Sequence, residues 1–539
     1  MSVSVYTFAA PLVGGTLLGL SVLGGVLSFP LAILSAGALT LSARSSHCTV
    51  TAHLIYGSLA GTIGGAWVPQ ALRTLGATPV ESQLGLAAAV MWSAIPGFVL
   101  LGIVARVTKN MNDSGGFAVY CLALFAVETA LVSLPGTVPW ILFGYAASGQ
   151  LGVAQLAAVG GVPLVSAALA AAAFALIRLI ESLRGDPRSQ NVRLPISFLS
   201  GFACLALFGA DFAHNASRAT PVDGHSVRFV AIQPAIPRPE RLRPTLQSLN
   251  TDRLVQYSTY ELEALEPSEH DTFVVWPENA LIDTGDTLIS ADELARAAAV
   301  SIGRPLILSA TRPTIGQPVT ELRNSLISLD SHGRIVAAAD KFRAVPAVEA
   351  TNNGWIESVA RSLIGEAGRG RRIETSPSLV PLESAGGASI ALCFEVLFPN
   401  IVSGRRPENA TAILNLADDS WVSSPLASRQ LTSIARFRAI EQRLPLVRVA
   451  HGGLSAAFDA FGRPITELPL DRYGSIVIEA FPARKPSWFS RSLILALPLG
   501  SGLSVWWSYP LVARLIFARR IAKKPTDHNV TAGLLEKDH

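Results

Sequence analysis

Three residues whose side chains could carry out acyl chemistry together each stand just beyond a strand-like run. They are Glu278 after TFVVW, Lys341 after RIVAAAD and Cys393 after SIAL. The C-terminal ends of strands are where open α/β layers usually place reactive groups. A thiol needs a base to become a thiolate, and the oxyanion formed by its attack on a carbonyl carbon needs a positive charge or hydrogen-bond donors. An acid, a cation and a thiol supply one of each, which makes Cys393 a candidate nucleophile.

Each of the three residues, taken singly, also fits a purely structural role. A free cysteine is most often a small apolar core residue, and a lone glutamate or lysine is most often a capping or solvated charge. The other cysteines lie in or beside apolar runs, so no disulfide can form within the polar part of the chain, and no Cys-x-x-Cys metal site is present. We therefore expect a free thiol at Cys393, no metal and no cofactor. The other cysteines are Cys48, Cys121 and Cys204.

The composition predicts a membrane protein with a large polar domain. Half of the 539 residues are hydrophobic and only 15% are charged, which is too apolar for an ordinary soluble protein. The apolar residues concentrate in residues 1–211, whereas residues 226–482 have normal charge density. The net charge of +4 is modest, and no arginine-rich run is interleaved with aromatic residues, so the sequence excludes a nucleic-acid partner.

The apolar region predicts seven membrane helices, because one crossing takes about 20 residues. The first block, residues 8–41, is too long for one crossing, and we expect Pro30 to divide it into two short helices. An eighth helix is predicted at residues 493–517, within a C-terminal membrane segment of 491–518 that leads into a tail of 519–539. The other five predicted helices are at residues 53–68, 84–107, 117–132, 151–180 and 194–210.

The short loops predict the orientation of these helices, because Lys and Arg are retained on the cytoplasmic side. With the N-terminus inside, the outer loops carry only Arg73. Seven helices then place residues 226–482 on the periplasmic side of a bacterial inner membrane and residues 519–539 in the cytoplasm. The inner loops carry Arg44, Arg106, Lys109, Arg178, Arg184, Arg188 and Arg193.

The polar region alternates strand-like runs with helical ones, which predicts an α/β sandwich of mixed sheets. Helical patterns are clearest at residues 292–300 and 427–443, and tight hairpin turns are expected at 330–333 and 459–463. The predicted strands are residues 227–233, 272–276, 306–309, 324–329, 389–392, 412–415, 446–450 and 475–479.

The order and surroundings of these residues resemble the carbon-nitrogen hydrolase (nitrilase) superfamily. Within it, the chain is similar to the membrane-embedded branch typified by the apolipoprotein N-acyltransferases. The resemblance spans most of the chain and implies a nitrilase-like α-β-β-α sandwich, extracytoplasmic, on a multi-pass α-helical membrane domain. The motifs that carry it are FVAIQPAIP at Phe229, VVWPENA at Val274, NSLISLDSHGRI at Asn324, ALCFEVLFP at Ala391, LNLADDSW at Leu414, ARFRAIEQRLPLVRVAHGG from Ala435 and PWILFGY from Pro139.

The resemblance implies a Glu-Lys-Cys triad. In it Cys393 is the nucleophile, Glu278 is the general base and Lys341 is the cation that stabilises the oxyanion. The family pattern also implies substrate-binding or supporting roles for three further residues, Glu349, Glu395 and Trp421. Structural roles stay open for these three, respectively as a cap of a lid loop, a partner of an arginine, and a core or interfacial aromatic residue.

Several positions depart from the acyltransferase pattern. Asp340 stands where a histidine usually precedes the lysine, and Phe394 replaces a common tyrosine. His451 lies in Ala-His-Gly where the family has Asn-Asn-Gly, and residues 347–348 read Ala-Val instead of Phe-Gly. A divergent paralogue, such as the nitrilase-like proteins encoded with conjugal-transfer genes, is therefore an alternative.

The function that the resemblance implies is acyl transfer in the membrane. An acyl chain would pass from a phospholipid, through a thioester at Cys393, to the N-terminal amine of a diacylglyceryl-lipoprotein. Seven membrane helices suit a lipid donor better than a small soluble amide. The alternatives are a membrane-tethered amidase, a conjugal-transfer-associated acyl enzyme with another acceptor, and a scaffold without turnover; the oligomeric state is open.

Overall fold

The computed structural model describes most of the chain up to Ala483. The predicted eighth helix, the tail and Cys48 lie outside the described residues. The described residues are 2–23, 27–44, 49–108, 113–134, 136–185, 193–218, 226–267, 271–285, 287–314, 321–349, 355–365, 367, 372–382 and 384–483.

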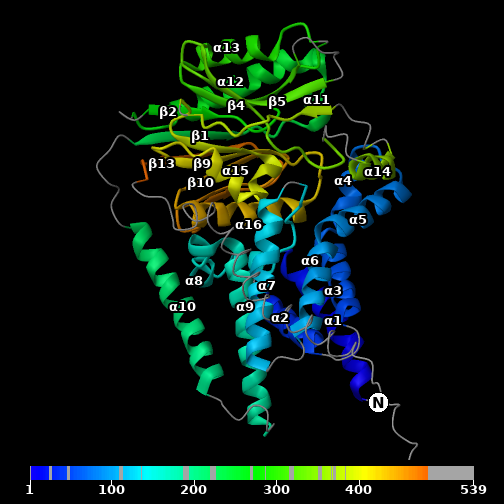
Figure 1. Ribbon diagram of the computed structural model, residues 1–539. Coiled ribbons are helices and arrows are strands. Elements are labelled where there is room, and N and C mark those ends of the chain that lie inside the picture. Colours follow the sequence, from blue (N-terminus) through cyan, green and yellow to red (C-terminus); the bar gives the residue numbers. More distant parts are fainter. Residues whose placement is uncertain are drawn as a thin grey trace, which may run out of the picture. The chain divides into compact units, whose positions relative to one another are not determined.

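The N-terminal half consists of apolar helices joined by short connections (Figure 1). They are α1 (Ser2–Ser21), α2 (Ser28–Arg44), α3 (Thr49–Gly64), α4 (Val68–Thr74), α5 (Pro79–Ser93), α6 (Ile95–Thr108), α7 (Asp113–Ser133), the 3₁₀ helix η1 (Phe143–Ala147), α8 (Leu151–Ala154), α9 (Ala157–Leu183) and α10 (Arg193–Arg218).

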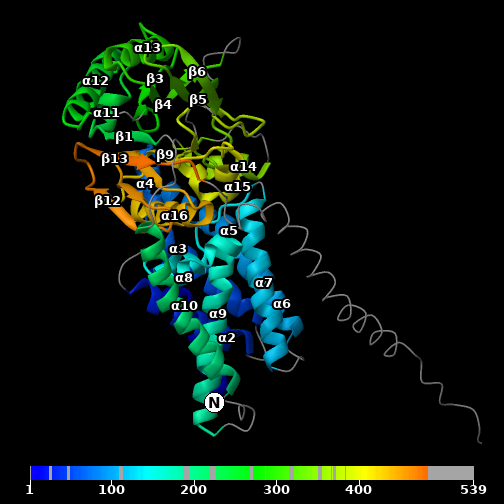
Figure 2. The same cartoon turned by 90° about the vertical axis from the view of Figure 1, so that its left-hand side faces the viewer.

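Three of the described helices are long and apolar enough to cross a membrane, namely α7, α9 and α10. The pair α5 and α6, bent by 41° at its break, makes a fourth candidate if it is one span. The apolar stretches Ala9–Ser21 and Ser28–Ala43 are shorter. Helix α9 packs between α7 and α10 (Figure 2). The number of spans, seven before the polar domain, stays a prediction.

The first two helices do not divide at Pro30, as the sequence had suggested. The break falls between Ser21 and Ser28, and Pro30 lies in the first turn of α2. A proline is tolerated there because the first N–H groups of a helix have no partner within the helix. The predicted single helix at residues 84–107 is likewise two helices, α5 and α6.

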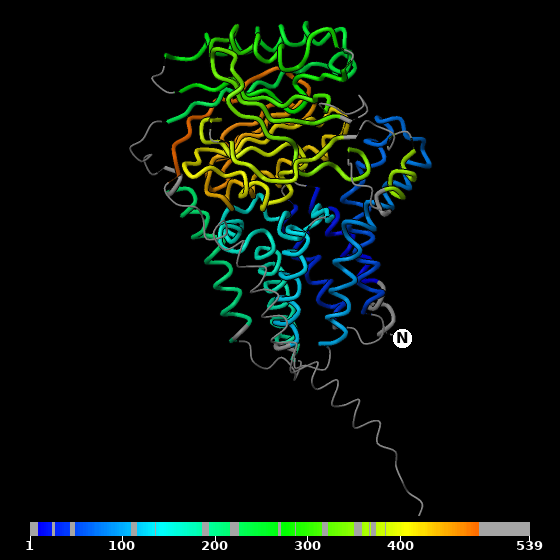
Figure 3. The backbone as a smooth tube through the Cα atoms, turned by 45° about the horizontal axis from the view of Figure 1, so that its top comes forward, coloured from blue at the N-terminus to red at the C-terminus, as the bar shows by residue number. Residues whose placement is uncertain are grey.

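The C-terminal half contains two β-sheets. In the first, the order is β13-β1-β2-β4-β5-β6, with β3 beside β4 and β7 beside β5; in the second it is β12-β11-β10-β9-β8. The last strand returns to pair antiparallel with the first strand of the domain (Figure 3). The strands are β1 (Val227–Gln233), β2 (Asp271–Val275), β3 (Leu281–Ile282), β4 (Leu306–Pro313), β5 (Glu321–Leu329), β6 (Ile335–Asp340), β7 (Arg372–Glu374), β8 (Ala388–Leu392), β9 (Ala412–Asp418), β10 (Leu446–His451), β11 (Ser455–Phe458), β12 (Pro464–Leu468) and β13 (Gly474–Ala480).

Helices cover the outer face of each sheet, so the domain has four layers (Figure 1). Strand β1 shows how alternation builds them: Phe229 packs between the two sheets, whereas Val230 packs against the helices above the first sheet. The predicted fold class, a helical membrane part with an α/β sandwich of mixed sheets, is therefore confirmed. The remaining helices are α11 (Arg238–Arg241), η3 (Pro244–Leu246), α12 (Gln247–Glu263), α13 (Ala291–Ile302), α14 (Trp355–Leu363), η5 (Cys393–Leu397), α15 (Pro399–Gly404) and α16 (Pro425–Gln442).

Helix α16 is shared by the two halves of the chain. It belongs to one continuous core with residues of the second sheet and of the membrane helices. Leu431, Phe437 and Ile440 are all buried in that core. A helix that is enclosed on both sides needs no single apolar stripe. Helix α16 therefore joins the polar domain to the membrane half, which consists of helices α1 to α10.

Candidate active site

Cys393 lies at the C-terminal end of β8, where the strand turns into η5. Its thiol is buried, and its backbone has φ = +45°, a left-handed conformation that few residues other than glycine adopt. Asn415 of the neighbouring strand β9 donates hydrogen bonds from Nδ2 to the carbonyl oxygens of Ala391 and Cys393, at 3.0 and 3.3 Å. The fold therefore holds the thiol in a strained turn of the kind found at functional sites.

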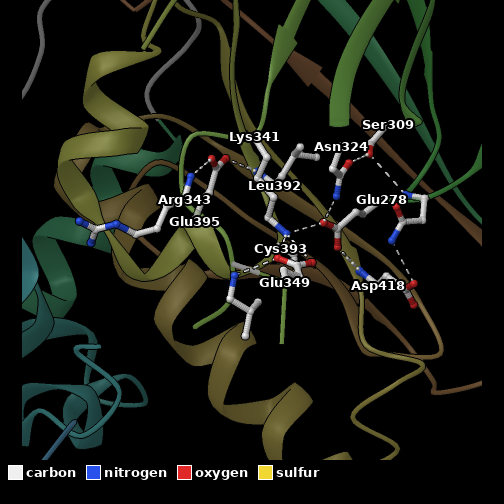
Figure 4. Close-up of polar contacts among 12 residues, drawn as sticks. Glu278, Ser309, Asn324, Lys341, Arg343, Glu349, Leu392, Cys393, Glu395 and Asp418 are labelled. Atoms are coloured by element: carbon white, nitrogen blue, oxygen red, sulfur yellow. Dashed lines mark hydrogen bonds and ion pairs between the residues drawn. The ribbon is translucent and has the colours of Figure 1, made fainter. Parts of the chain in front are cut away.

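Lys341 links two carboxylates next to this turn (Figure 4). Its Nζ donates to Glu278 Oε1 at 2.9 Å and to both carboxylate oxygens of Glu349, at 3.0 and 2.8 Å. The Lys341 side chain is fully buried and Glu278 is 2% exposed. Strands β2, β6 and β8 thus bring the acid, the cation and the thiol together, although more than a hundred residues separate Glu278 from Cys393.

Glu278 is held by donors on both of its oxygens. Besides Lys341, Oε1 accepts from Asn324 Nδ2 at 2.8 Å, and Oε2 accepts from the backbone N–H of Asp418 at 3.1 Å. Ser309 in turn donates to Asn324 Oδ1 at 2.6 Å. Asn324 and Asp418 were not singled out from the sequence as site residues, although each lies in a quoted family motif, Asn324 within β5 and Asp418 at the end of β9.

Burial and charge set the protonation states of the three groups. Burial raises the pKa of Glu278 to about 7, although the nearby Lys341 ammonium acts in the opposite direction. Burial and then the Glu278 carboxylate raise the pKa of the Cys393 thiol well above its ordinary value. Burial alone would lower the pKa of Lys341, but the carboxylates of Glu278 and Glu349 raise it well above its ordinary value. The resting site therefore holds a neutral thiol, an ammonium and a carboxyl group that titrates near neutral pH.

Glu395 pairs with an arginine, the structural alternative considered for it. Its carboxylate is fully buried and accepts from Arg405 Nη1 at 2.5 Å. It also accepts from the backbone N–H groups of Leu392 at 2.9 Å and of Phe342 at 2.7 Å. Glu395 therefore ties the segment after Lys341 to the turn that carries Cys393.

Replacing Glu395 by alanine should destabilise the protein by about 3 kcal/mol, because it leaves the buried Arg405 guanidinium without its carboxylate. The measurement is thermal or denaturant unfolding of the purified protein in detergent. The matched control is Glu467→Ala, at an exposed position of β12, which should change stability by about 0.5 kcal/mol or less. Equal stability of the two variants would contradict the assigned role of Glu395.

An apolar cavity of about 170 Å³ adjoins Cys393. Both halves of the chain line it: Trp67, Leu72 and Trp140 come from the membrane half, and Val345 and Phe394 from the polar domain. Trp421, which packs against Val422 and Ala427, also lines it. The site thus has a charged side, formed by Glu278, Lys341 and Glu349, and an apolar side that reaches into the membrane half.

The structure shows the environments of two residues that depart from the family pattern, Asp340 and His451. Asp340 accepts a hydrogen bond from Ser325 at 2.5 Å and lies 3.5 Å from Arg323, so it is part of the sheet's polar edge. His451 is fully buried at the end of β10, and within the described residues neither ring nitrogen has a hydrogen-bond partner. Burial holds the pKa of His451 well below its ordinary value, so this imidazole is neutral.

Each half of the chain matches a known protein-family domain. The apolipoprotein N-acyltransferase N-terminal domain matches residues 14–175, and the carbon-nitrogen hydrolase domain matches residues 269–481. The apolipoprotein N-acyltransferase of Agrobacterium fabrum is 30% identical, over 69% of this chain and 68% of that protein. That of Rhizobium rhizogenes is 31% identical, over 71% of each.

The chain belongs to the apolipoprotein N-acyltransferase family. The resemblance inferred from its motifs is confirmed. As a member of this family it is a bacterial membrane protein and an acyltransferase of the carbon-nitrogen hydrolase superfamily. Among solved structures, an amidase from Nesterenkonia sp. is similar, with 18% identity and a TM-score of 0.33 over 51% of this chain and 95% of that one.

Proposed function

We propose that this N-acyltransferase family member moves an acyl chain from a phospholipid to the N-terminal amine of a diacylglyceryl-lipoprotein. The observation that carries the proposal is the position of Cys393 between two unlike environments. On one side are the buried charges of Glu278 and Lys341, and on the other is the apolar cavity that extends between membrane helices. A small soluble amide would need no such cavity, whereas a fatty acyl chain would fill it.

In the first half-reaction, Glu278 accepts the proton of the Cys393 thiol as the sulfur attacks the ester carbonyl. Lys341 donates to the oxygen that becomes negative in the tetrahedral intermediate. The C–O bond of the ester then breaks, the lysophospholipid leaves with the proton held by Glu278, and a thioester remains on Cys393.

In the second half-reaction, the acceptor amine attacks the thioester carbonyl. Glu278 takes a proton from the amine, the C–S bond breaks, and the Cys393 thiolate recovers the proton. The product is an amide, and the enzyme returns to its starting state. In this mechanism Glu349 keeps Lys341 charged and directed at the site, and Trp421 contacts the acyl chain.

The covalent intermediate is the direct test. Incubation with phospholipid and without acceptor should accumulate acylated protein, with the adduct on Cys393 and none on Cys121 or Cys204. Intact-mass and peptide mass spectrometry, with Cys393→Ser in parallel, measures it. Cys121 and Cys204 are matched controls because they are free thiols that have no hydrogen bond or ion pair to an acid or a lysine among the described residues.

The discharge of the adduct separates the alternatives. Loss of the acyl mass on addition of a diacylglyceryl peptide, much faster than in water alone, is the expected outcome. Equally fast discharge in water would favour an amidase or esterase. An intact, lipid-bound protein that never carries an adduct would contradict the proposal and favour a scaffold.

We also propose that the polar domain is periplasmic and that the protein spans the inner membrane. The basic residues of the short loops support this orientation. A reporter that is active only in the cytoplasm, fused after Arg218 at the end of α10, should therefore be silent, and a periplasmic reporter at the same position should be active. The opposite pattern would reverse the topology.

A further inference from the structure

Gln430 of α16 contacts three segments of the membrane half through one side chain. Its Oε1 accepts from the indole Nε1 of Trp67 at 3.0 Å and from that of Trp140 at 2.7 Å. Its Nε2 donates to the carbonyl oxygen of Gly64, the last residue of α3, at 2.9 Å. The Gln430 side chain is buried, with 4% of the residue exposed.

A glutamine suits this position because of its hydrogen-bonding groups. An amide oxygen has two lone pairs and can accept from both indoles at once, while the amide nitrogen satisfies a helix-end carbonyl that has no partner within α3. No apolar residue of similar size could do this, and the buried indole N–H of Trp140 and the partly buried one of Trp67 would then lack this acceptor.

The two tryptophans form part of the cavity wall beside Cys393. Both line the cavity, and their ring centroids lie 4.8 Å apart with an angle of 43° between the ring planes. Leu431, the residue after Gln430, lines the same cavity, whereas Gln430 itself does not. Gln430 therefore acts on the shape of the cavity only through the indoles that it orients.

We infer that Gln430 is a positioning residue that sets the acyl-chain selectivity of this site. The inference rests on the proposed function, since it takes the cavity to hold the donor's acyl chain. By fixing two indoles with one acceptor, Gln430 fixes how much space the wall leaves for the chain. Without it the indoles can turn out of the wall, and longer chains gain access.

The test compares Gln430→Met with Gln442→Met in the full-length protein. Gln442 is a matched control, because it is a buried glutamine of the same helix whose side-chain amide has no partner among the described residues. Each protein is incubated with phosphatidylethanolamine vesicles that mix lauroyl, palmitoyl and arachidoyl chains, and the acyl masses on Cys393 are quantified.

In Gln430→Met the ratio of arachidoyl to palmitoyl adduct should rise by about tenfold relative to the wild type, since a single methylene in an apolar pocket already discriminates by that order. Gln442→Met should keep the wild-type ratio. A wild-type ratio in Gln430→Met, or the same rise in both variants, overturns the inference.

If Gln430→Met does not accumulate folded, the double variant Trp67→Phe with Trp140→Phe decides. It removes both indole donors and keeps aromatic rings in the wall, so the same rise is expected, and an unchanged ratio overturns the inference. No adduct at all on the wild-type protein would refute the proposed function, and with it this inference. An adduct with an unchanged ratio refutes the inference alone.

Discussion

Replacing Lys341 by methionine should slow acyl-enzyme formation by about a hundredfold or more, because removal of one neutral oxyanion donor already costs that much. The rate is measured as the appearance of the acyl mass on Cys393 after mixing with phospholipid. Arg334→Met is the matched control: Arg334 is the exposed cation just before β6, the strand that Lys341 directly follows, and it pairs with Asp330 in the hairpin turn. That variant should keep the wild-type rate.

A second effect of this substitution must be separated from loss of the oxyanion donor. Without Lys341, the buried carboxylate of Glu278 faces the partly buried carboxylate of Glu349, and the pKa of Glu278 should rise further because the opposing Lys341 charge is gone. The double variant Lys341→Met with Glu349→Gln removes one of the two charges. If it recovers most of the activity, Lys341 serves mainly to keep Glu278 ionised; if it stays as slow as Lys341→Met, the oxyanion role stands.

Replacing Glu278 by glutamine should slow the reaction by about a hundredfold to ten-thousandfold, the range typical for loss of a general base. The amide is close in shape and can still accept a hydrogen bond from Lys341, so the protein should fold and insert as the wild type does. Glu479→Gln is the control and should be neutral, because Glu479 of β13 is a partly exposed carboxylate that pairs with Arg228 of β1.

The pH profile gives the same prediction a second measurement. The pKa of Glu278 is about 7, and only the ionised form can accept the thiol proton. The wild-type rate should therefore fall as pH decreases below about 7, whereas the residual rate of Glu278→Gln should be flat over that range. If the wild-type rate does not fall below about pH 7, or if Glu278→Gln shows the same fall, Glu278 is not the general base.

The proposed mechanism needs the membrane helices and the polar domain to keep fixed positions relative to each other. The apolar side of the site comes from helices at the start of the sequence and the charged side from strands far along it. Helix α16 bridges them: Gln430 binds Gly64, Trp67 and Trp140, and Glu441 accepts from the backbone N–H of Val162 at 3.2 Å. Val162 directly follows the break of α9 at Gly160 and Gly161, so Glu441 satisfies a donor that the broken helix leaves free.

The amino-acid sequence by itself determined the class of the protein and the place of its candidate triad. An apolar N-terminal half cannot remain in water, and short alternating apolar runs predict strands wherever one face is buried, so β1 was predicted with its observed ends, Val227 and Gln233. Glu278, Lys341 and Cys393 stood out because each follows such a run. Short strands such as β3 and β7, and helix α12, were not predicted, since two or three residues carry no period and α12 is only weakly amphipathic.

Only the tertiary structure decided what each charged group touches and where the cavity lies. Glu349 and Glu395 are both acids near the triad, yet one pairs with Lys341 and the other with Arg405, a difference set by side-chain direction and not by spacing. Trp67, Trp140 and Gln430 are up to 363 residues apart, and their contacts depend on how α16 packs on the membrane half. Local periodicity reports which face of an element is buried, but it holds no information about which distant element covers that face. The packing of the two halves therefore settles the shape of the site.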